Sequence, residues 1–487
     1  MYQKNLCQKF LNNIFNNFKN SKNIFYRDNN NEYTYKESFP KICKLINFIK
    51  FKKTKKIIVL SDKSLNYYLI VLSIIFTGRT WIQVSPNVPI KRIKKIIKLS
   101  KCKIGFYDES FKNQEIVKKL NINLFNPNEI FQKLNNKKIK SIKKVKEENT
   151  AMIFFTSGST SDPKGVSISY KSFIYSAYQQ VKNLNYKKNI EVFSDYHDSS
   201  FVMSLNVIFP ATFLSSCISP ITSYFDKINP VSHIKKNKIS VLITVPSFFI
   251  YINNYIKKKL KIRNVVFCGE NLSLNIFKTC LKKINFNYLH NCYGATELSP
   301  WAYYYNYLKK DYSIIKRFNQ VPIGKPFDGL GHHVNNNKEL CISGPILSKG
   351  YLIKSQNKNK FFYMKNKRYY NTGDICEKYS KDLMFILGRN DKQIKLKGYR
   401  INLLEIEKHI KKISGIEFVM CFKKSNQEKL VLFIVSKIKN IKIKTTKYLL
   451  KNLPKYMVPS EIFVKRKIKL NKNGKVDRNF YLKSFDK

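Results

Sequence analysis

A segment rich in hydroxyl groups and glycine follows directly on a predicted strand at residues 151–155. It begins at Thr156, ends at Gly165 and reads Thr-Ser-Gly-Ser-Thr-Ser-Asp-Pro-Lys-Gly. Glycine lets backbone N–H groups come close to anionic oxygens, hydroxyls donate hydrogen bonds, and a lysine neutralises negative charge. Because the chain contains no G-x-x-x-x-G-K-[ST] pattern, the segment predicts a phosphate-binding loop of a different kind from the Walker loop.

Five further short motifs follow this loop along the chain. They are 291–297 (NCYGATE), 370–374 (YNTGD), 388–401 (GRNDKQIKLKGYRI), 453–459 (LPKYMVP) and 473–478 (NGKVDR). With the phosphate loop, they resemble in type and order the motifs of the adenylate-forming superfamily. That family includes acyl-CoA synthetases, adenylation domains of non-ribosomal peptide synthetases and D-alanine–carrier-protein ligases. The resemblance covers about residues 30 to 482.

The resemblance implies a two-step reaction. A carboxylate attacks ATP to give an acyl-adenylate and pyrophosphate, and the acyl group then passes to a thiol. Attack on the α-phosphate builds negative charge on phosphoryl oxygens, so catalysis consists of positioning and electrostatic stabilisation. By the same resemblance, the β- and γ-phosphates are held by Thr156, Ser157, Gly158, Ser159, Thr160 and Lys164.

Three residues carry the catalytic roles that the resemblance implies. Thr296 meets the α-phosphate, and Glu297 ligates Mg²⁺, a hard cation that prefers oxygen ligands beside a nucleotide. Lys475 bridges the substrate carboxylate and the α-phosphate from a mobile domain. The chain has 81 lysines, so only the surrounding Asn-Gly-Lys-Val-Asp-Arg motif distinguishes Lys475 from a surface lysine.

Four more residues are expected to bind the nucleotide. Tyr293 packs beside the adenine with Gly294 next to it, and Asp374 accepts hydrogen bonds from both ribose hydroxyls. Arg389 is one of only ten arginines in a chain that otherwise uses lysine. Its planar guanidinium suits a bidentate contact with ribose or phosphate.

The type of acyl substrate is inferred from a Phe-Asp-x-Ser element. In amino-acid-activating members of the family, this element holds the α-ammonium. In one register this element is Phe201-Val202-Met203-Ser204, and Val202 replaces the aspartate. An ammonium beside a valine would be buried without a partner, which is costly, so this register predicts a hydroxy, keto, aryl or fatty acid. A second register, His197-Asp198-Ser199-Ser200, restores the aspartate. The pocket residues carried over with the first register are Phe201, Val202, Met203, Asn206, Val266, Cys268, Cys292, Pro300 and Trp301.

Short apolar runs alternate with helix-length segments over most of the chain, which predicts an α/β architecture. Strands are expected at 56–61, 81–85, 104–107, 150–155, 241–245, 265–267 and 288–292, and helices at 64–76, 171–183, 247–259 and 274–283. We expect a large N-terminal domain, residues 1–390, with mixed, mostly parallel sheets flanked by helices. A small α+β C-terminal domain, residues 391–487, follows. The resemblance places a hinge at Asp391 and puts Gly398 on the loop that swings in for the thiol step.

Composition excludes several other classes of function. The chain has 91 Lys+Arg against 31 Asp+Glu, a formal charge of +60, but nucleic-acid readers rely on arginine, and this chain is poor in it. The ten cysteines form no C-x-x-C pair, and the N-terminus has no secretory h-region. The longest apolar run, 67–76, is about half of a membrane span. These features predict a cytoplasmic protein without a nucleic-acid or membrane partner.

The leading hypothesis is a free-standing adenylation enzyme that uses ATP and Mg²⁺ and loads a phosphopantetheinyl carrier protein in trans, since the chain ends nine residues after Arg478. An acyl-CoA ligase is the first alternative. A catalytically decayed protein that acts only as a basic binding protein is the second.

Overall fold

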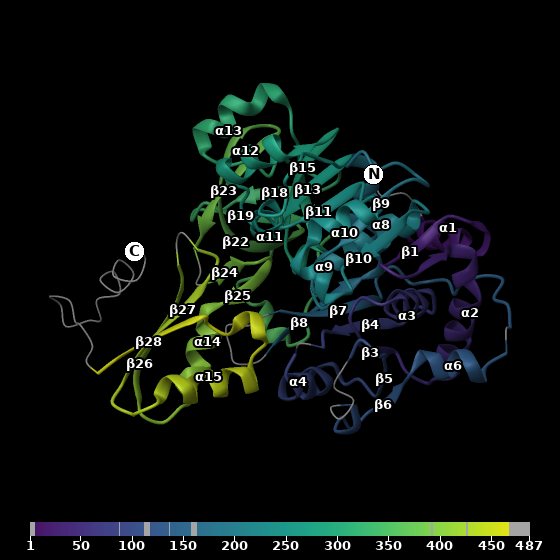
Figure 1. Cartoon of the computed structure of the whole chain (residues 1–487), viewed down its shortest axis with the longest axis horizontal. Coiled ribbons are helices and arrows are strands. Elements are labelled where there is room, and N and C mark those ends of the chain that lie inside the picture. The colour runs from purple at the N-terminus through teal and green to yellow at the C-terminus, as the bar shows by residue number, and fades with distance from the viewer. Residues whose placement is uncertain are drawn as a thin grey trace.

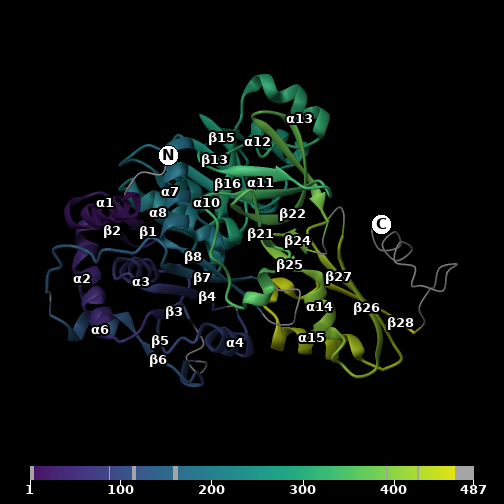
Figure 2. The same cartoon turned by 180° about the vertical axis from the view of Figure 1, so that it is seen from behind.

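The computed structural model describes residues 5–86, 88–111, 117–135, 137–156, 163–390, 393–424 and 427–466. A larger body, up to residue 390, contains three main sheets with helices around them, and the part from 393 to 466 lies against one side of it (Figure 1). The first helices, α1 (Leu6–Asn20) and α2 (Tyr35–Phe51), lie at the opposite end of the molecule from β26 (Ile416–Lys423) and β28 (Glu461–Lys465) (Figure 2).

A seven-stranded sheet flanks the predicted phosphate loop. In the described part of the chain its order is β20-β8-β7-β4-β3-β5-β6. The inner strands are parallel, whereas β8 runs antiparallel to β7 and places Thr156 opposite Lys164. Its strands are β3 (Lys56–Leu60), β4 (Thr80–Val84), β5 (Ile104–Tyr107), β6 (Asn123–Phe125), β7 (Thr150–Thr156), β8 (Lys164–Ser169) and β20 (Gly350–Tyr351).

The second sheet has nine described strands in the order β17-β16-β15-β13-β11-β9-β10-β1-β2, parallel at its centre and antiparallel at both ends. Its strands are β1 (Ile24–Arg27), β2 (Glu32–Thr34), β9 (Val192–Asp195), β10 (Cys217–Pro220), β11 (Val241–Thr244), β13 (Asn264–Cys268), β15 (Tyr288–Gly294), β16 (Trp301–Asn306) and β17 (Lys325–Pro326). Parallel strands buried on both faces read as continuous apolar runs, which is why 241–244 and 264–268 were predictable.

A third, antiparallel sheet carries the YNTGD motif on its longest strand. It comprises β18 (Gly331–Val334), β19 (Glu339–Ser343), β21 (Phe361–Met364), β22 (Lys367–Ser380) and β23 (Leu383–Arg389), and β12 (Leu260–Lys261) pairs separately with β14 (Ile284–Asn285). The register of β22 with β23 sets Asp374 opposite Arg389. Two functional candidates from different motifs are thereby fixed side by side.

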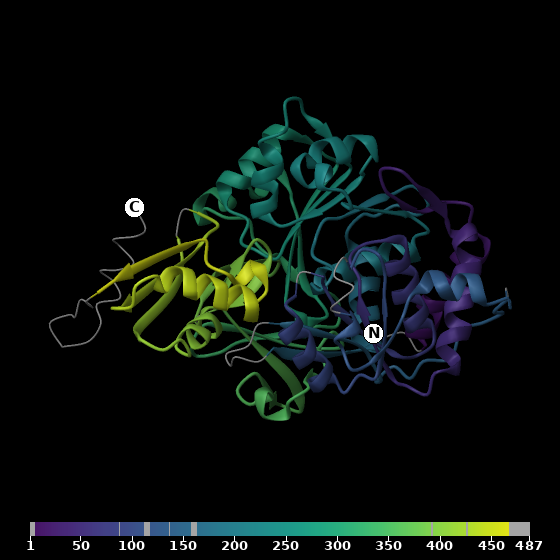
Figure 3. The same cartoon turned by 60° about the horizontal axis from the view of Figure 1, so that its bottom comes forward.

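Helices cover the sheets, and their apolar faces build the core (Figure 3). Helix α3 (Leu65–Phe76) is buried along almost its whole length because its sequence is apolar on every face. A capping box between Thr34 and Glu37 starts α2. The remaining helices of the body are α4 (Ile90–Ser100), α6 (Pro127–Lys133), α7 (Tyr170–Asn183), α8 (Leu205–Phe213), α9 (Tyr224–Ile228), α10 (Pro230–Lys236), α11 (Pro246–Asn253), α12 (Leu274–Lys283) and α13 (Tyr312–Phe318).

The part from 393 to 466 builds a hydrophobic cluster of its own around Ile401, Ile406 and Leu432. A hairpin of β24 (Gln393–Leu396) and β25 (Tyr399–Asn402) comes first. It is followed by α14 (Leu403–Ile410), then by β26, β27 (Leu430–Ser436) and β28 in one sheet, with α15 (Ile441–Asn452) beside α4 of the body. The hairpin points into the body, where it reaches the site described below.

The α/β fold and its mostly parallel central sheets are confirmed. One predicted helix, 247–259, is wrong in length, because α11 ends at Asn253. Asn253 and Asn254, which favour turns over helix interiors, lie at this end, and three consecutive lysines follow at 257–259. Within the described residues, no helix combines the length and apolar character needed to cross a membrane.

Candidate active site

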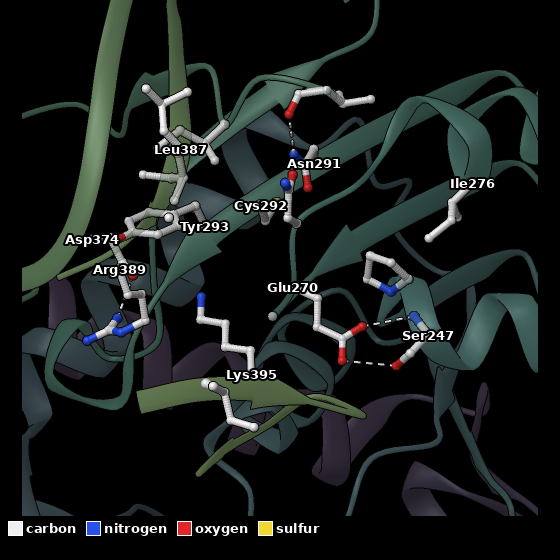
Figure 4. A pocket seen from close by; sticks show the side chains of 18 of the residues that line it. Ser247, Glu270, Ile276, Asn291, Cys292, Tyr293, Asp374, Leu387, Arg389 and Lys395 are labelled. Atoms are coloured by element: carbon white, nitrogen blue, oxygen red, sulfur yellow. Dashed lines mark hydrogen bonds and ion pairs between the residues drawn. The ribbon is translucent and has the colours of Figure 1, made fainter. Parts of the chain in front are cut away.

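The carboxyl ends of the parallel strands β11, β13 and β15 meet at one edge of the nine-stranded sheet. Ligands of open α/β sheets bind outside such ends. A cavity of about 510 Å³ lies there, lined by segments that leave these strands, by β22 and β23, and by the hairpin β24–β25. Figure 4 shows Glu270, Tyr293, Asp374, Arg389 and Lys395 around this cavity, which we call the nucleotide cavity.

Asp374 is a carboxylate of the nucleotide cavity that is held on both of its oxygens. The Tyr293 hydroxyl donates to its Oδ2 at 2.5 Å, and Arg389 Nη1 forms an ion pair with its Oδ1. The other guanidinium nitrogen of Arg389 donates to the carbonyl oxygen of Thr372 at 3.0 Å. Burial, together with the Asp374 charge, raises the pKa of Tyr293 well above its usual value, so the phenol stays a donor. Three sequence-predicted nucleotide residues are therefore in direct contact.

Glu297 lies in the 3-10 turn after β15 and is almost fully buried. Tyr351 donates to its Oε1 at 2.6 Å, and Arg400 Nη1 lies 3.0 Å from its Oε2. Burial alone would raise the pKa of Glu297, but the guanidinium and the tyrosine hydroxyl outweigh it and hold the pKa below its ordinary value. The carboxylate is therefore charged and already holds a cation.

Lys164 completes this corner of the site. Its Nζ lies 5.4 Å from the centre of the Tyr351 ring, a cation–π distance. Burial lowers the pKa of Lys164, although the nearby Glu297 charge counteracts that effect. The lysine that ends the predicted phosphate loop thus points to the same place as Glu297.

Glu270 connects the body to the hairpin. Its carboxylate accepts from Ser247 N at 2.9 Å, from Ser247 Oγ at 3.0 Å and from Gly398 N at 2.7 Å. Lys395, from the same hairpin, extends into the nucleotide cavity, with Nζ 5.2 Å from the Tyr293 ring centre (Figure 4). Both Lys395 and Gly398 therefore face the site rather than solvent in this arrangement.

A second, smaller cavity of about 40 Å³ adjoins the first, and we call it the acyl cavity. It is lined by Phe201, Val202, Met203, Pro300 and Trp301 together with Gly294, Thr296, Gly398 and Arg400 among others. A Cβ on Gly294 would overlap the carbonyl oxygen of Pro300, so only glycine lets the backbone of Pro300 and Trp301 come this close. Asp374 is the one carboxylate among the lining residues that the structure describes, and both its oxygens are bonded.

Asp198 of the second register faces a third cavity, of about 350 Å³. Its carboxylate accepts from Ser85 Oγ at 3.0 Å and from Ser200 N at 2.9 Å. Half of the residues that line this cavity carry aromatic rings, and Tyr399 and Gly398 of the hairpin close one side. The two candidate registers therefore place their key residues in different cavities, with Gly398 between them.

The remaining predicted site residues fall into four groups. Cys292 lines the nucleotide cavity, and Asn206 lies behind Met203, bonded to Gln180 at 2.8 Å. Val266 and Cys268 are fully buried in β13 and line none of these cavities. Thr156 ends β7 opposite Lys164. Six predicted residues lie outside the described residues: Ser157, Gly158, Ser159, Thr160, Asp391 and Lys475.

Four residues that build the candidate site were not singled out from the sequence: Glu270, Tyr351, Lys395 and Arg400. Arg400 carried a usable signal, because it is one of ten arginines and lies in the 388–401 motif. The same scarcity argument that selected Arg389 applies to it. Glu270 and Tyr351 carried no such signal, since each acts through a contact with a distant segment.

Comparison with known proteins defines the class of this site. The family model described as AMP-binding enzyme matches residues 15–352, and the chain belongs to this family of adenylate-forming enzymes. It is 25% identical to D-alanine–D-alanyl carrier protein ligase of Staphylococcus aureus, over 94% of the chain and 95% of the ligase.

Two further similarities are more limited in what they show. The chain is 27% identical to bacitracin synthase 1 of Bacillus licheniformis over 86% of its length, but spans only 8% of that protein. The adenylation domain AlmE of Vibrio cholerae, solved with glycyl-adenosine-5'-phosphate, has a TM-score of 0.85 at 18% identity, and the alignment covers 99% of this chain and 98% of AlmE. At that identity the likeness shows the fold alone.

The site also fits the divalent cation that adenylate-forming enzymes use. Among the described residues, no cluster of three or more His, Cys, Asp or Glu side chains could enclose a metal ion. A single buried carboxylate, Glu297, is a donor of the kind expected for Mg²⁺, which is commonly held by one or two carboxylates and by the substrate's phosphates.

Proposed function

We propose that this protein activates a carboxylic acid that lacks an α-amine and transfers the acyl group to the phosphopantetheine thiol of a carrier protein in trans. Val202 carries the substrate assignment. It lines the acyl cavity beside Thr296, and the one carboxylate among the described lining residues is already bonded to Arg389 and Tyr293. An α-ammonium there would be desolvated without a counter-ion, which is strongly unfavourable.

The chain's own residues account for the electrostatics of the first step. Negative charge grows on the phosphoryl oxygens as the carboxylate attacks, and preorganised cations stabilise it best in a site that excludes water. Arg389 of the body lines the acyl cavity, and Lys395 and Arg400 line it as well when the hairpin that carries Gly398 is docked. The Asp374 carboxylate orients Arg389 and is available to the ribose hydroxyls, while Thr296 supplies a hydroxyl on the wall of the acyl cavity.

Glu297 and Lys164 would bind the phosphate side of the nucleotide, with Glu297 holding Mg²⁺. When bound, that ion would neutralise phosphate charge. Lys475 is assigned to the substrate carboxylate and α-phosphate on its motif alone, and Asp391 to a hinge between domains 1–390 and 391–487. Rotation at such a hinge would present different faces of the small domain to the two half-reactions.

The third cavity suits the pantetheine arm of a thiol acceptor. It leads to Gly398 and is walled by Phe201, Phe248, Tyr251 and Tyr399, with the carboxylates of Asp198 and Glu428 at its margin. Apolar rings suit the neutral pantetheine arm, which CoA and a carrier protein's prosthetic group share. The similarity to a carrier-protein ligase over nearly its full length supports a carrier protein as the acceptor.

ATP–pyrophosphate exchange over a panel of amino, hydroxy, keto, aryl and fatty acids tests the proposal. We expect exchange only with acids that lack an α-amine. Exchange with amino acids alone would move the substrate contact to Asp198, and silence with every acid would favour a decayed binding protein. Discharge of the adenylate by a phosphopantetheinylated carrier protein, compared with discharge by CoA, then decides between the two acceptors.

A further inference from the structure

The wall of the acyl cavity contains a buried hydrogen-bond donor that lacks an acceptor. Trp301 lines this cavity and is only 1% exposed. Its indole Nε1 is buried, and no atom of the described residues accepts a hydrogen bond from it. Leaving a buried N–H group unpaired costs about 1–3 kcal/mol, and buried polar groups of native proteins are nearly always bonded. We therefore expect the acceptor to come from the molecule that fills the cavity.

Trp81, the second of the two tryptophans of the chain, shows the ordinary arrangement. Its ring is fully buried as well, but its Nε1 donates to Gln83 Oε1 at 3.1 Å. A buried indole can thus be satisfied within this fold. The missing acceptor is a feature of the position of Trp301.

Gln180 of α7 holds a buried acceptor behind the same wall. Its Nε2 donates to Asn206 Oδ1 at 2.8 Å and to Ser176 Oγ at 3.4 Å, which uses both hydrogens of the amide. Its Oε1 is buried and accepts from none of the described residues. Asn206 Nδ2 lies 3.5 Å from Met203 Sδ, and Ser176 Oγ donates to the carbonyl oxygen of Trp301 at 3.3 Å. Gln180 is therefore tied on both sides to residues that line the acyl cavity.

A donor and an acceptor left over at one wall are matched by a group that can both accept and donate. A hydroxyl group does both. A keto oxygen only accepts, an ammonium only donates, and a hydrocarbon chain does neither. The hydroxyl is thus the simplest group that satisfies Trp301 and Gln180 together.

Resting on the proposed function, we infer that the activated acid carries a hydroxyl group that accepts a hydrogen bond from Trp301 Nε1 and donates one to Gln180 Oε1. Aliphatic hydroxy acids and phenolic aryl acids meet this condition. Keto acids, fatty acids and aryl acids without a hydroxyl do not. Trp301 and Gln180 select the acid and take no part in the chemical steps.

The first test compares acids that differ by a single hydroxyl in ATP–pyrophosphate exchange. The pairs are lactate with propionate, 3-hydroxybutyrate with butyrate and 4-hydroxybenzoate with benzoate, extended by the matching pair of any other acid that supports exchange. In the pair that fits, kcat/KM should be at least about 100-fold higher for the hydroxylated acid, because its counterpart leaves both protein groups unpaired. Equal values within every active pair would overturn the inference. Silence with every acid would instead contradict the proposed function.

Variants assign the preference to the two side chains. Trp301→Phe and Gln180→Met each remove one hydrogen-bonding group and should each reduce the preference for the hydroxylated acid about tenfold. A merely structural defect would lower kcat/KM for both members of a pair alike. The controls are Trp81→Phe and Gln179→Met, since Gln179 Oε1 already accepts from Asn183 at 3.0 Å, and both should keep the preference. An unchanged preference in a folded variant of Trp301 and in one of Gln180 would overturn the inference.

Nuclear magnetic resonance of the indole N–H groups gives a readout that does not depend on exchange. The labelled full-length protein has two such signals, and the one that disappears in Trp301→Phe belongs to Trp301. At saturation, the preferred hydroxy acid should move the Trp301 indole proton further downfield than its hydroxyl-free counterpart does, and the Trp81 signal should stay in place. Equal shifts with both acids would overturn the inference. The expected shift without any exchange would contradict only the proposed function.

Discussion

Arg92 of α4 and Glu405 of α14 form an ion pair at 2.7 Å that joins the body to the 393–466 region, and their side chains are 5% and 0% exposed. The nearby Tyr399 and Tyr456 rings stack with centres 3.9 Å apart, and Phe201 of the body lies 5.7 Å from Tyr399. Charge and aromatic contacts thus hold the same interface.

The Arg92–Glu405 pair gives a prediction for a double-mutant cycle. Arg92→Met deprives the buried Glu405 carboxylate of its guanidinium and should destabilise the docked arrangement by about 3 kcal/mol. Arg92→Met/Glu405→Met should recover most of that loss, because apolar side chains replace both charges. Energy transfer between α4 and α15 during urea titration measures the effect. Losses that simply add in the double variant would contradict a direct coupling.

A second prediction concerns Asp374. Asp374→Asn removes the charge that pairs with Arg389 and the acceptor assigned to the ribose, so the Kd of ATP should rise about 10- to 100-fold, as expected for a charged hydrogen bond worth about 1.5–3 kcal/mol. Asp382→Asn is the control, since Asp382 is exposed and lies 3.9 Å from Lys325. Equal Kd values for both variants would remove Asp374 from the nucleotide site.

A third prediction concerns Val202. Val202→Asp introduces a carboxylate into the acyl cavity, so ATP–pyrophosphate exchange with the preferred acid should fall at least about tenfold while exchange with amino acids rises. Val202→Thr keeps the shape without a charge and should retain the original preference. Loss of exchange with the preferred acid in both variants alike would mean that any polar group at this position, and not specifically a charge, disrupts binding of the acid.

A fourth prediction concerns pH. Burial lowers the pKa of His290 from 6.5 to about 4, and its Nδ1 lies 2.6 Å from Asn306 Oδ1. Between these pKa values the unfolded chain binds a proton that the folded chain does not, so stability falls as the pH drops from 7 towards 4, by up to about 3 kcal/mol at about 1.4 kcal/mol per pKa unit.

His290→Gln should remove this contribution, so the difference in Tm between wild type and variant should shrink as the pH is lowered from 7 to 4.5. The difference, and not the absolute Tm, is the informative quantity, because other groups titrate in the same range. Parallel pH profiles for the two proteins would show that His290 does not titrate on unfolding.

Much of the fold was predictable because its central strands are buried on both faces. Residues 104–107 and 274–283 form the strand and the helix expected of them at the expected bounds. Contacts between residues that are distant in sequence were less predictable. The antiparallel β22–β23 pairing sets Asp374 against Arg389 through a turn that carries no strong sequence signal.

The residues of the candidate active site also divide into those that motifs predicted and those that they did not. Motifs predicted that Tyr293, Asp374 and Arg389 belong together, and the structure places them in contact. Glu270 could not be found in this way, since its role depends on Gly398, a residue 128 positions further along the chain. Such contacts exist only once the hairpin has docked, and no local spacing encodes them.

The burial of the cysteines has a consequence for an enzyme that makes a reactive mixed anhydride. Cys292 lines the nucleotide cavity and Cys268 lies on the strand next to it, and burial raises the pKa of both thiols well above the usual value. Because the thiolate is the reactive form, neither sulfur competes with an incoming acceptor for the activated acyl group. The protein is thereby protected from self-acylation by its own intermediate.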